Sequence, residues 1–278
     1  MKRRWFLIGL ALPVISVSCQ ALTTVANRAL SNKDSNARRT EGDPNASDAI
    51  QVRRDSKTLV MATSANYPPY EQRDGDAKDA DIVGFDIDLA TLIAERMGRQ
   101  LTVVDVDFSG LLPAVINDEV DIAMAALEPT RSRKQRVEFS DIYYRSRHAL
   151  ISLDGYLRSR DLNYQIIGLR KGSVQARYGE RLNAEYPDLD IAGYDTLEEV
   201  FEALDIGAVE GAILEATVAT TYLRRYPDFQ AQVMPSDRAT GSAIALPKDS
   251  PLRREVNAAI NDIKASGEMA RLIAQWFS

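Results

Sequence analysis

The chain has 278 residues, of which 34 are Lys or Arg and 40 are Asp or Glu, so its formal net charge is −6. This acidic balance does not favour general nucleic-acid binding, which depends on basic side chains that neutralise phosphates. The single cysteine excludes an intrachain disulfide, and the single histidine excludes a metal site built from several histidines.

The first residues have the composition of an export signal. Lys2, Arg3 and Arg4 precede an apolar run over residues 5–17. That run is shorter than the ~20 apolar residues of a membrane-spanning helix but fits the apolar region of a signal peptide. The pattern Arg-Arg-x-Phe-Leu also loosely matches a twin-arginine signal, so the export route stays open. Residues 1–18 are therefore predicted to be a signal peptide.

Cys19 follows this apolar run directly and resembles the lipidated cysteine of bacterial lipoproteins. Ser16 departs from that pattern, which usually has Leu or Val there, and Ser16 with Ser18 also fits ordinary signal cleavage. Both interpretations remove the residues before Cys19 and export the chain. We expect a lipid on Cys19 and a flexible tether over residues 19–56, because this polar stretch has too few apolar side chains to form a core.

The folded body, residues 57–278, begins with alternating strands and helices. Asp86 is predicted to cap the first helix and Gly98 to end it. This alternation is typical of a parallel sheet that is covered by helices. The predicted elements are a strand at 58–63, a helix up to residue 97, a strand at 101–104, a helix at 109–117 and a strand at 121–125.

A second series with the same alternation follows. It comprises strands at 166–169, 189–192 and 212–214, a helix after residues 172–173, helices at 196–204 and 216–226, and two amphipathic helices over 252–277 split near residues 266–267. Ligands of open α/β sheets bind beyond the carboxyl ends of the strands. Two such series facing each other are therefore expected to form a cleft.

Four segments of the body resemble the family 3 extracellular solute-binding proteins. They are TLVMATSANYPPYE, GFDIDLATLIAERM, DFSGLLPAVINDEVDIAMAALEPTRSRKQRVEFSDIYY, and GSAIALPKDSPL with the final QWFS. The resemblance implies an α/β, two-lobed periplasmic-binding-protein fold of type II, with a ligand cleft between lobes that are joined by two hinge strands. Lobe 1 would comprise residues 57–148 and 238–278 and lobe 2 residues 149–237, with hinges near 145–149 and 235–243.

The resemblance also implies a function. The protein would be a monomer in the periplasm or at the cell surface that captures a polar amino acid, uses no cofactor, and delivers the ligand to an ABC permease in the inner membrane. Two other functions stay open. One is a periplasmic prephenate-type dehydratase on the same fold, with Glu128 or Glu215 as the general acid. The other is the ligand-sensing module of a receptor, although the sequence has no second membrane segment.

Several residues match ligand-binding positions of the family. Within TRSRK, Arg133 matches the arginine that clamps the ligand's α-carboxylate, which a guanidinium can do with two parallel hydrogen bonds. The other basic residues of this segment are expected to be solvated. Glu215 stands where the family has an ammonium-binding aspartate, with an ordinary helix cap as the alternative. The remaining matches are the aromatic residues Tyr67 and Phe108, the turn Gly172-Ser173-Val174 that meets the carboxylate, and Ala126, Glu128 and Arg170.

Three residues bear on the identity of the ligand. Glu128 stands where the family usually has Thr or Ser, and its charge favours a positive ligand. Ser64 stands where binders of basic amino acids are acidic, and Arg170 stands where a cation can face an amide or acidic side chain. Both therefore argue against a basic amino acid, although Glu128 and Arg170 could also pair across the closed cleft. The sequence predicts a polar amino acid without identifying it.

Overall fold

The computed structural model of the chain describes residues 56–75, 77, 79–235 and 240–277, all of which belong to one structural unit, residues 48–278. The predicted signal peptide, Cys19 and nearly all of the predicted tether lie outside the described residues. Within these residues no helix is both long and apolar enough to cross a membrane.

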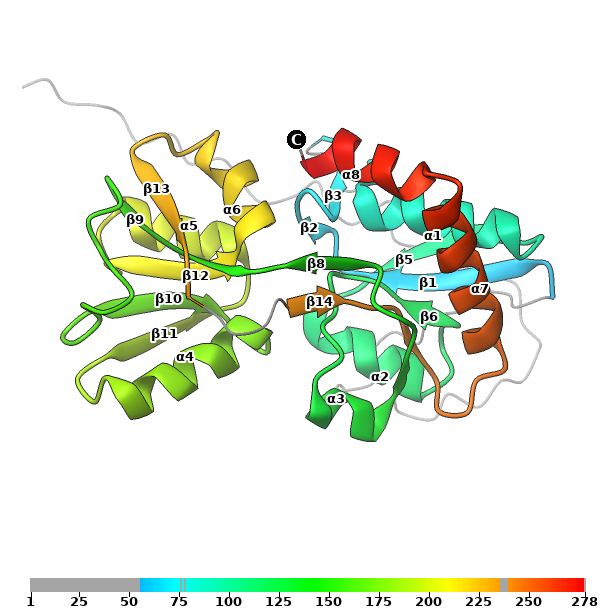
Figure 1. Cartoon of the computed structure of the whole chain (residues 1–278), viewed down its shortest axis with the longest axis horizontal. Helices are drawn as coiled ribbons and strands as arrows, with labels where there is room; N and C mark the ends of the chain where they lie inside the picture. Colours follow the sequence, from blue (N-terminus) through cyan, green and yellow to red (C-terminus); the bar gives the residue numbers. More distant parts are fainter. Residues whose placement is uncertain (1–55, 76, 78, 236–239, 278) are drawn as a thin grey trace, which may run out of the picture. The chain divides into compact units, whose positions relative to one another are not determined.

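The first sheet has five strands in the order β5-β1-β6-β15-β7. The central strand β1 is parallel to β5 and β6, whereas β15 is antiparallel to β6 and β7. Helices lie on both sides of this sheet (Figure 1). The strands are β1 (Thr58–Thr63), β5 (Gln100–Asp105), β6 (Ile122–Ala123), β7 (Glu138–Phe139) and β15 (Ala245–Leu246); the helices are α1 (Phe85–Arg96), α2 (Leu111–Ile116), α3 (Arg131–Arg136), α7 (Leu252–Ala265) and α8 (Glu268–Phe277).

Strand β1 is buried on both faces, which explains its continuous run of apolar residues. Leu59 and Met61 belong to the core cluster that contains α1 and α7, while Val60 and Ala62 belong to the cluster that contains α2. Because successive side chains of a strand point to opposite faces, one six-residue strand contributes to both cores.

The second sheet also has five strands, in the order β11-β10-β12-β9-β13. Strand β10 is parallel to β11 and β12, and β9 is antiparallel to β12 and β13. The strands are β9 (His148–Leu153), β10 (Ile166–Arg170), β11 (Asp190–Tyr194), β12 (Gly211–Glu215) and β13 (Phe229–Val233); the helices are α4 (Val174–Glu185), α5 (Leu197–Asp205) and α6 (Ala216–Leu223).

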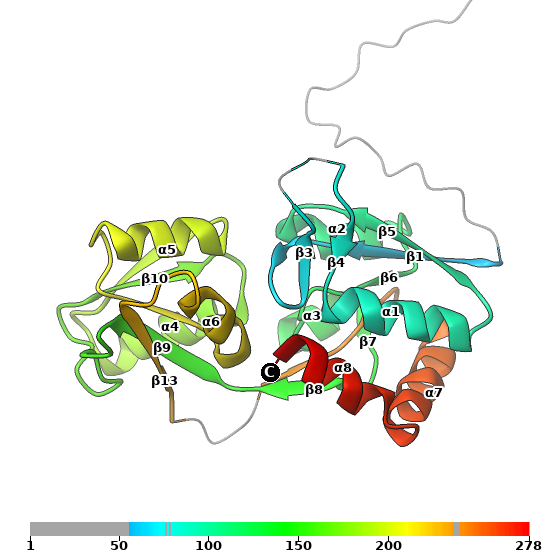
Figure 2. The ribbon, with the colours of Figure 1, turned by 90° about the horizontal axis from the view of Figure 1, so that it is seen from above.

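Two short strands connect the sheets. β8 (Tyr144–Ser146) follows the first sheet and leads into β9, and β14 (Thr240–Ser242) leads back into β15. They pair antiparallel with each other, and Figures 1 and 2 show β8 running from one sheet to the other. The predicted lobe and hinge boundaries stay predictions, because residues 236–239 lie outside the described part of the chain.

Two smaller groups complete the first half of the fold. A three-stranded sheet is formed by β2 (Asn66–Tyr67), β3 (Glu71–Arg73) and β4 (Ile82–Val83), in that order. A 3-10 turn, η1 (Phe108–Gly110), precedes α2. The helix predicted over 109–117 therefore begins as a 3-10 turn, and the α-helix covers only its second part.

The prediction that Asp86 caps the first helix is wrong. The N-cap residue of α1 is Gly84, at φ 144°, and no side chain caps this helix end. A Cβ at position 84 would lie 2.2 Å from the carbonyl oxygen of Tyr70, so only glycine fits there. Asp86 lies inside the first turn and is fully buried. Its carboxylate accepts hydrogen bonds from Ala126 and Tyr143 and does not cap the helix.

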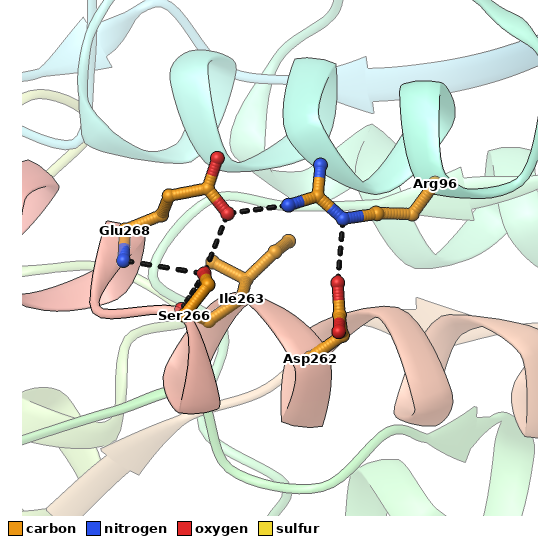
Figure 3. Close-up of polar contacts among 5 residues, drawn as sticks. All are labelled: Arg96, Asp262, Ile263, Ser266 and Glu268. Atoms are coloured by element: carbon orange, nitrogen blue, oxygen red, sulfur yellow. Dashed lines mark hydrogen bonds and ion pairs between the residues drawn. The ribbon is translucent and has the colours of Figure 1, made fainter.

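The C-terminal helices are held against α1 by a small polar cluster (Figure 3). Arg96 of α1 contacts Asp262 of α7 at 2.6 Å and Glu268 of α8 at 2.5 Å. Ser266, at the predicted break between the two helices, donates to Glu268. Because surface ion pairs contribute little stability, we expect this cluster to add little to the free energy of unfolding. The end of α8 reaches β8, where the ring of Phe277 lies 4.5 Å from that of Tyr144.

Candidate functional site

A cavity is lined by Tyr67 of β2, by loop and helix residues that follow strands of the first sheet, by residues of β10 and β12 and the start of α4, and by strand β14. Apart from the two residues of β14, they lie at or after the carboxyl ends of β1, β5, β6, β10 and β12, which is the edge where open α/β sheets bind ligands. The lining residues are Tyr67, Phe108, Ala125, Ala126, Glu128, Arg133, Arg170, Ser173, Val174, Gln175, Glu215, Gly241 and Ser242. All predicted site residues except Gly172 are among them, and Gly172 lines the neighbouring cavity. Their roles in ligand binding stay predictions.

The basic segment at α3 contains one buried cation among exposed ones. Arg133 is only 6% exposed, whereas Arg131, Lys134 and Arg136 are exposed, as expected from the sequence. Thr130 caps the helix by accepting the backbone N–H of Arg133. This cap holds the first turn of α3, from which the side chain of Arg133 reaches the cavity.

The guanidinium of Arg133 bridges the two halves of the cavity. It donates to the carbonyl oxygen of Glu128 at 3.0 Å and to that of Gly172 at 3.3 Å. It forms no ion pair with a carboxylate in the described part of the chain. Burial, with the nearby charge of Arg177, lowers the pKa of Arg133 to about 10, so it is still positive at neutral pH. A buried cation without an ion pair is suited to hold an anion.

A second buried guanidinium, that of Arg170, lies against the predicted aromatic residues. Its Cζ atom is 4.3 Å from the ring centroid of Phe108 and 5.4 Å from that of Tyr67, as in cation–π contacts. It donates to Asn66 Oδ1 at 2.9 Å and to Ser64 Oγ at 3.3 Å. Arg170 Nε, which is buried, has no hydrogen-bond partner among the described residues.

The pairing of Glu128 with Arg170, which the sequence left open, is not observed. Arg170 points instead to Ser64 and Asn66, and Glu128 Oε2 is buried without a hydrogen-bond partner in the described part. Burial raises the pKa of Glu128, and the charge of Arg133 opposes this shift. Glu128 is therefore a half-buried acid whose main attraction is to Arg133.

Glu215 is the last residue of β12 and precedes α6. It occupies the N-cap position, but its side chain makes no capping hydrogen bond, so the alternative role of a helix cap is not observed. Instead Oε1 accepts a short hydrogen bond from the hydroxyl of Tyr70. Burial raises the pKa of Glu215 to about 7, and the hydroxyls of Tyr70, Ser146 and Thr217 oppose this shift. Near neutral pH this acid is close to half ionised.

The turn after β10 begins α4. Gly172 has φ 68°, and Ser173 caps the helix by accepting the N–H of Ala176 at 3.0 Å. The N-terminus of a helix attracts anions through its free N–H groups and its dipole. The first turn also contributes Gln175, whose Nε2 lies 3.4 Å from His148 Nδ1. Burial lowers the pKa of His148 to about 4, so this histidine is neutral at pH 7.

Sequence reasoning missed four residues that line the cavity. They are Ala125, Gln175, Gly241 and Ser242. Three of them had a usable signal: Ala125 ends the predicted strand 121–125, and Gly241 and Ser242 lie in the predicted hinge at 235–243. Gln175 had none, because its approach to the cavity depends on how the first turn of α4 is oriented.

The sequence is similar to that of known solute-binding proteins. The model of the bacterial extracellular solute-binding proteins, family 3, matches residues 59–278. The chain is 34% identical to the arginine-binding extracellular protein ArtP of Bacillus subtilis, covering 80% of this chain and 87% of ArtP. It is 28% identical to the ABC transporter arginine-binding protein 1 of Escherichia coli, covering 80% and 91% of the two chains.

Solved structures of solute-binding proteins have a similar fold. The substrate-binding protein of an amino acid ABC transporter is 33% identical with a TM-score of 0.73, covering 79% of this chain and 99% of that one. A periplasmic binding protein of Salmonella typhimurium, described as highly specific for arginine, is 30% identical with a TM-score of 0.72, covering 80% and 100%.

Proposed function

The chain belongs to family 3 of the bacterial extracellular solute-binding proteins, and on that premise we propose that its cavity binds one amino acid whose side chain carries a hydrogen-bond acceptor. The fold is the two-lobed type II fold of periplasmic binding proteins. Its members capture solutes outside the cytoplasm, and this chain is an amino-acid-binding component that functions with an ABC transporter. The finer question is which amino acid the cavity accepts.

The main-chain groups of the ligand would be held by charges of opposite sign. Arg133 would clamp the α-carboxylate with two parallel hydrogen bonds, and the first turn of α4 would add backbone N–H groups. Glu215 would accept hydrogen bonds from the α-ammonium group. In support, Arg133 is buried without an ion pair in the described residues, and both side chains line one cavity.

The side-chain preference is carried by one observation, the position of Arg170. Its guanidinium lies over Phe108 and Tyr67, the rings predicted to enclose the ligand side chain. A cationic ligand side chain would meet a fixed like charge in a buried site, which is strongly unfavourable. An amide or carboxylate side chain would instead accept a hydrogen bond from Arg170, whose Nε has no partner in the described part.

A basic amino acid is the second candidate, since relatives of this chain are named as arginine-binding proteins. Glu128 favours it, because Oε2 is buried without a hydrogen-bond partner among the described residues. However, the positive charges of Arg133, Arg181 and Arg177 already act on Glu128 and oppose the upward shift in its pKa. We therefore place the acceptor class first.

Calorimetric titration of the purified chain tests the choice directly. Glutamine, glutamate, asparagine and aspartate form one panel, and arginine, lysine and histidine the other. The acceptor panel is expected to contain the tightest ligand. A basic amino acid as the tightest ligand would contradict the proposed role of Arg170 while leaving amino-acid binding intact.

We propose further that the protein binds its ligand without turnover. The family and the relatives are substrate-binding transport proteins, and they do not favour the dehydratase alternative. Glu128 and Glu215 would be the acids available for such a reaction. Incubating the chain with prephenate and assaying for decarboxylated product provides the test, since steady product formation would reject this proposal.

We also propose that the chain is a monomer held at the membrane through a lipid on Cys19, with residues 19–56 as a flexible tether between the anchor and the folded body. The support is the sequence around Cys19 and the extracytoplasmic location of the family. Cells that express the wild type or Cys19→Ser are fractionated after labelling with a radioactive fatty acid. The wild type should be labelled and membrane-bound and the variant neither, whereas a soluble, unlabelled wild type would reject the anchor.

A further inference from the structure

Two buried carboxyl groups, one of them bonded to the cavity wall at Ala126, have no role in the proposed binding. Glu71 of β3 and Asp86 of α1 are both fully buried. Neither oxygen of Glu71 has a hydrogen-bond partner among the described residues, and neither does Asp86 Oδ1. Such orphaned acceptors are rare in folded proteins and require an explanation.

The second oxygen of Asp86, in contrast, is fully used. Oδ2 accepts the backbone N–H of Ala126 at 3.0 Å and the hydroxyl of Tyr143 at 2.8 Å. One partner belongs to the wall of the cavity and the other is bonded to that wall. Ala126 lines the cavity, and Tyr143 donates its own N–H to the carbonyl oxygen of Ser242, another lining residue.

The backbone N–H of Asp86 donates to the carbonyl oxygen of Tyr70, the residue before Glu71, at 2.9 Å, so the two buried carboxyls are neighbours. Each carboxyl shifts the pKa of the other. Two ionised carboxylates cannot remain adjacent in a buried site, because burial and like charge both oppose ionisation. One proton between them removes the conflict, since a protonated Glu71 donates to Asp86 Oδ1, which gives a partner to that oxygen and to one of the two oxygens of Glu71. We propose that Glu71 and Asp86 share one proton and that this pair positions Ala126 and Tyr143 for ligand binding.

The surrounding charges agree with a proton held mainly on Glu71. Burial raises the pKa of Glu71 well above its usual range, and the charge of Asp86 adds to this, while Arg170 opposes it. Burial raises the pKa of Asp86 to about 7, but the hydrogen bonds from Ala126 and Tyr143 favour its ionised form. The other titratable groups that face the pair are Glu215, Tyr67, Tyr70 and Tyr143.

The positioning role follows from the backbone of Ala126. Its φ is 48°, a left-handed conformation that is uncommon for a residue other than glycine. The hydrogen bond from its N–H to Asp86 helps to hold this conformation, which sets the direction of the chain into Leu127 and Glu128. Asp86 and Glu71 are therefore positioning residues, and this part of the inference rests on the proposed function of the cavity.

Stability should then depend on pH in a defined direction. A carboxyl whose pKa is raised in the folded state keeps its proton there and loses it on unfolding. Its contribution is fully present below the unfolded pKa, roughly 4.3 for Glu, and is lost as the pH rises towards the folded pKa. For one such group the unfolding equilibrium constant rises about tenfold per pH unit in this window.

The test compares the wild type with Glu71→Gln, whose amide mimics the protonated acid, and with Glu95→Gln, the same change on the exposed side of α1. Denaturant unfolding is measured without ligand from pH 5 to pH 8.5. Glu71→Gln should remove about one proton from the pH dependence, a tenfold smaller change per unit. Infrared difference spectra at pH 8.5 should show a protonated carboxyl in the wild type and in Glu95→Gln but not in Glu71→Gln. An unchanged slope or the absence of this band would overturn the shared proton.

Ligand titration at pH 7 tests the positioning role separately. Asp86→Ala should bind at least about tenfold more weakly than the wild type, because the N–H of Ala126 loses its partner, whereas Glu95→Gln, on the exposed side of α1, should bind within about threefold of the wild type. If Asp86→Ala does not fold, Tyr143→Phe removes one donor and should still weaken binding measurably. Folded variants of Asp86 or Tyr143 with wild-type affinity would overturn the role, and a wild type that binds no amino acid would reject the proposed function but not the shared proton.

Discussion

Replacing Arg133 by alanine should remove the principal contact to the ligand's α-carboxylate. The side chain is 6% exposed, has no ion pair within the described part, and donates to carbonyl oxygens on both sides of the cavity. Truncating one partner of a desolvated, hydrogen-bonded charge pair costs about 2–5 kcal/mol. Since about 1.4 kcal/mol corresponds to tenfold in affinity, the dissociation constant should rise at least about thirtyfold.

The neighbouring arginines provide matched controls. Arg131 and Arg136 lie on the same helix but are exposed, so Arg131→Ala and Arg136→Ala should change affinity less than about threefold. Arg133→Lys should recover only part of the loss, because an ammonium group cannot form the bidentate pair. The assay is calorimetric titration of all four variants at fixed salt. Equal losses for the three alanine variants would indicate a general electrostatic effect and refute the role given to Arg133.

Four further predictions concern specificity, pH, motion and stability. Arg170→Leu combined with Ser64→Asp should shift the preference towards arginine in a competition titration, because the like charge is removed and an acid is added; an unchanged preference would exclude these positions. Affinity should fall up to about tenfold per pH unit as the pH drops below 7, since Glu215 with a pKa of about 7 becomes protonated, and Glu215→Gln should bind weakly without this dependence. Small-angle scattering should show a smaller radius of gyration with saturating ligand, as the two lobes close about β8 and β14, and an identical radius would argue against closure. Gly84→Ala should lower the free energy of unfolding by more than about 2 kcal/mol through overlap with the backbone of Tyr70, while Gly75→Ala, also at positive φ but with no atom within 4 Å, should lose less.

Local patterns in the sequence were enough for most of the fold. The apolar run at β1 is a short-range signal, and β1 has the predicted bounds; the helix predicted over 196–204 is α5, which begins one residue later, after its N-cap Thr196. Arg133 could be selected among four basic residues because the family motif fixes its spacing from Thr130. The exposure of its neighbours agrees with that selection.

The burial of Asp86 could not be predicted in this way. An acidic residue at the start of a helix normally indicates a cap, but its two donors lie 40 and 57 residues further along the chain. The contact with Glu71 is likewise set by how β3 meets α1. Strands β9 and β13 were also missed. They join the second sheet through antiparallel pairs, which lie outside the alternating strand–helix pattern used for the prediction.

A crystal structure of the chain with its tightest amino acid provides the most direct measurement of the central claim. We expect the α-carboxylate within hydrogen-bonding distance of both terminal nitrogens of Arg133, the α-ammonium on Glu215, and an acceptor of the ligand side chain on Arg170. A ligand bound in the reverse orientation, or one whose side chain displaces Arg170 from Phe108 and Tyr67, would contradict the account.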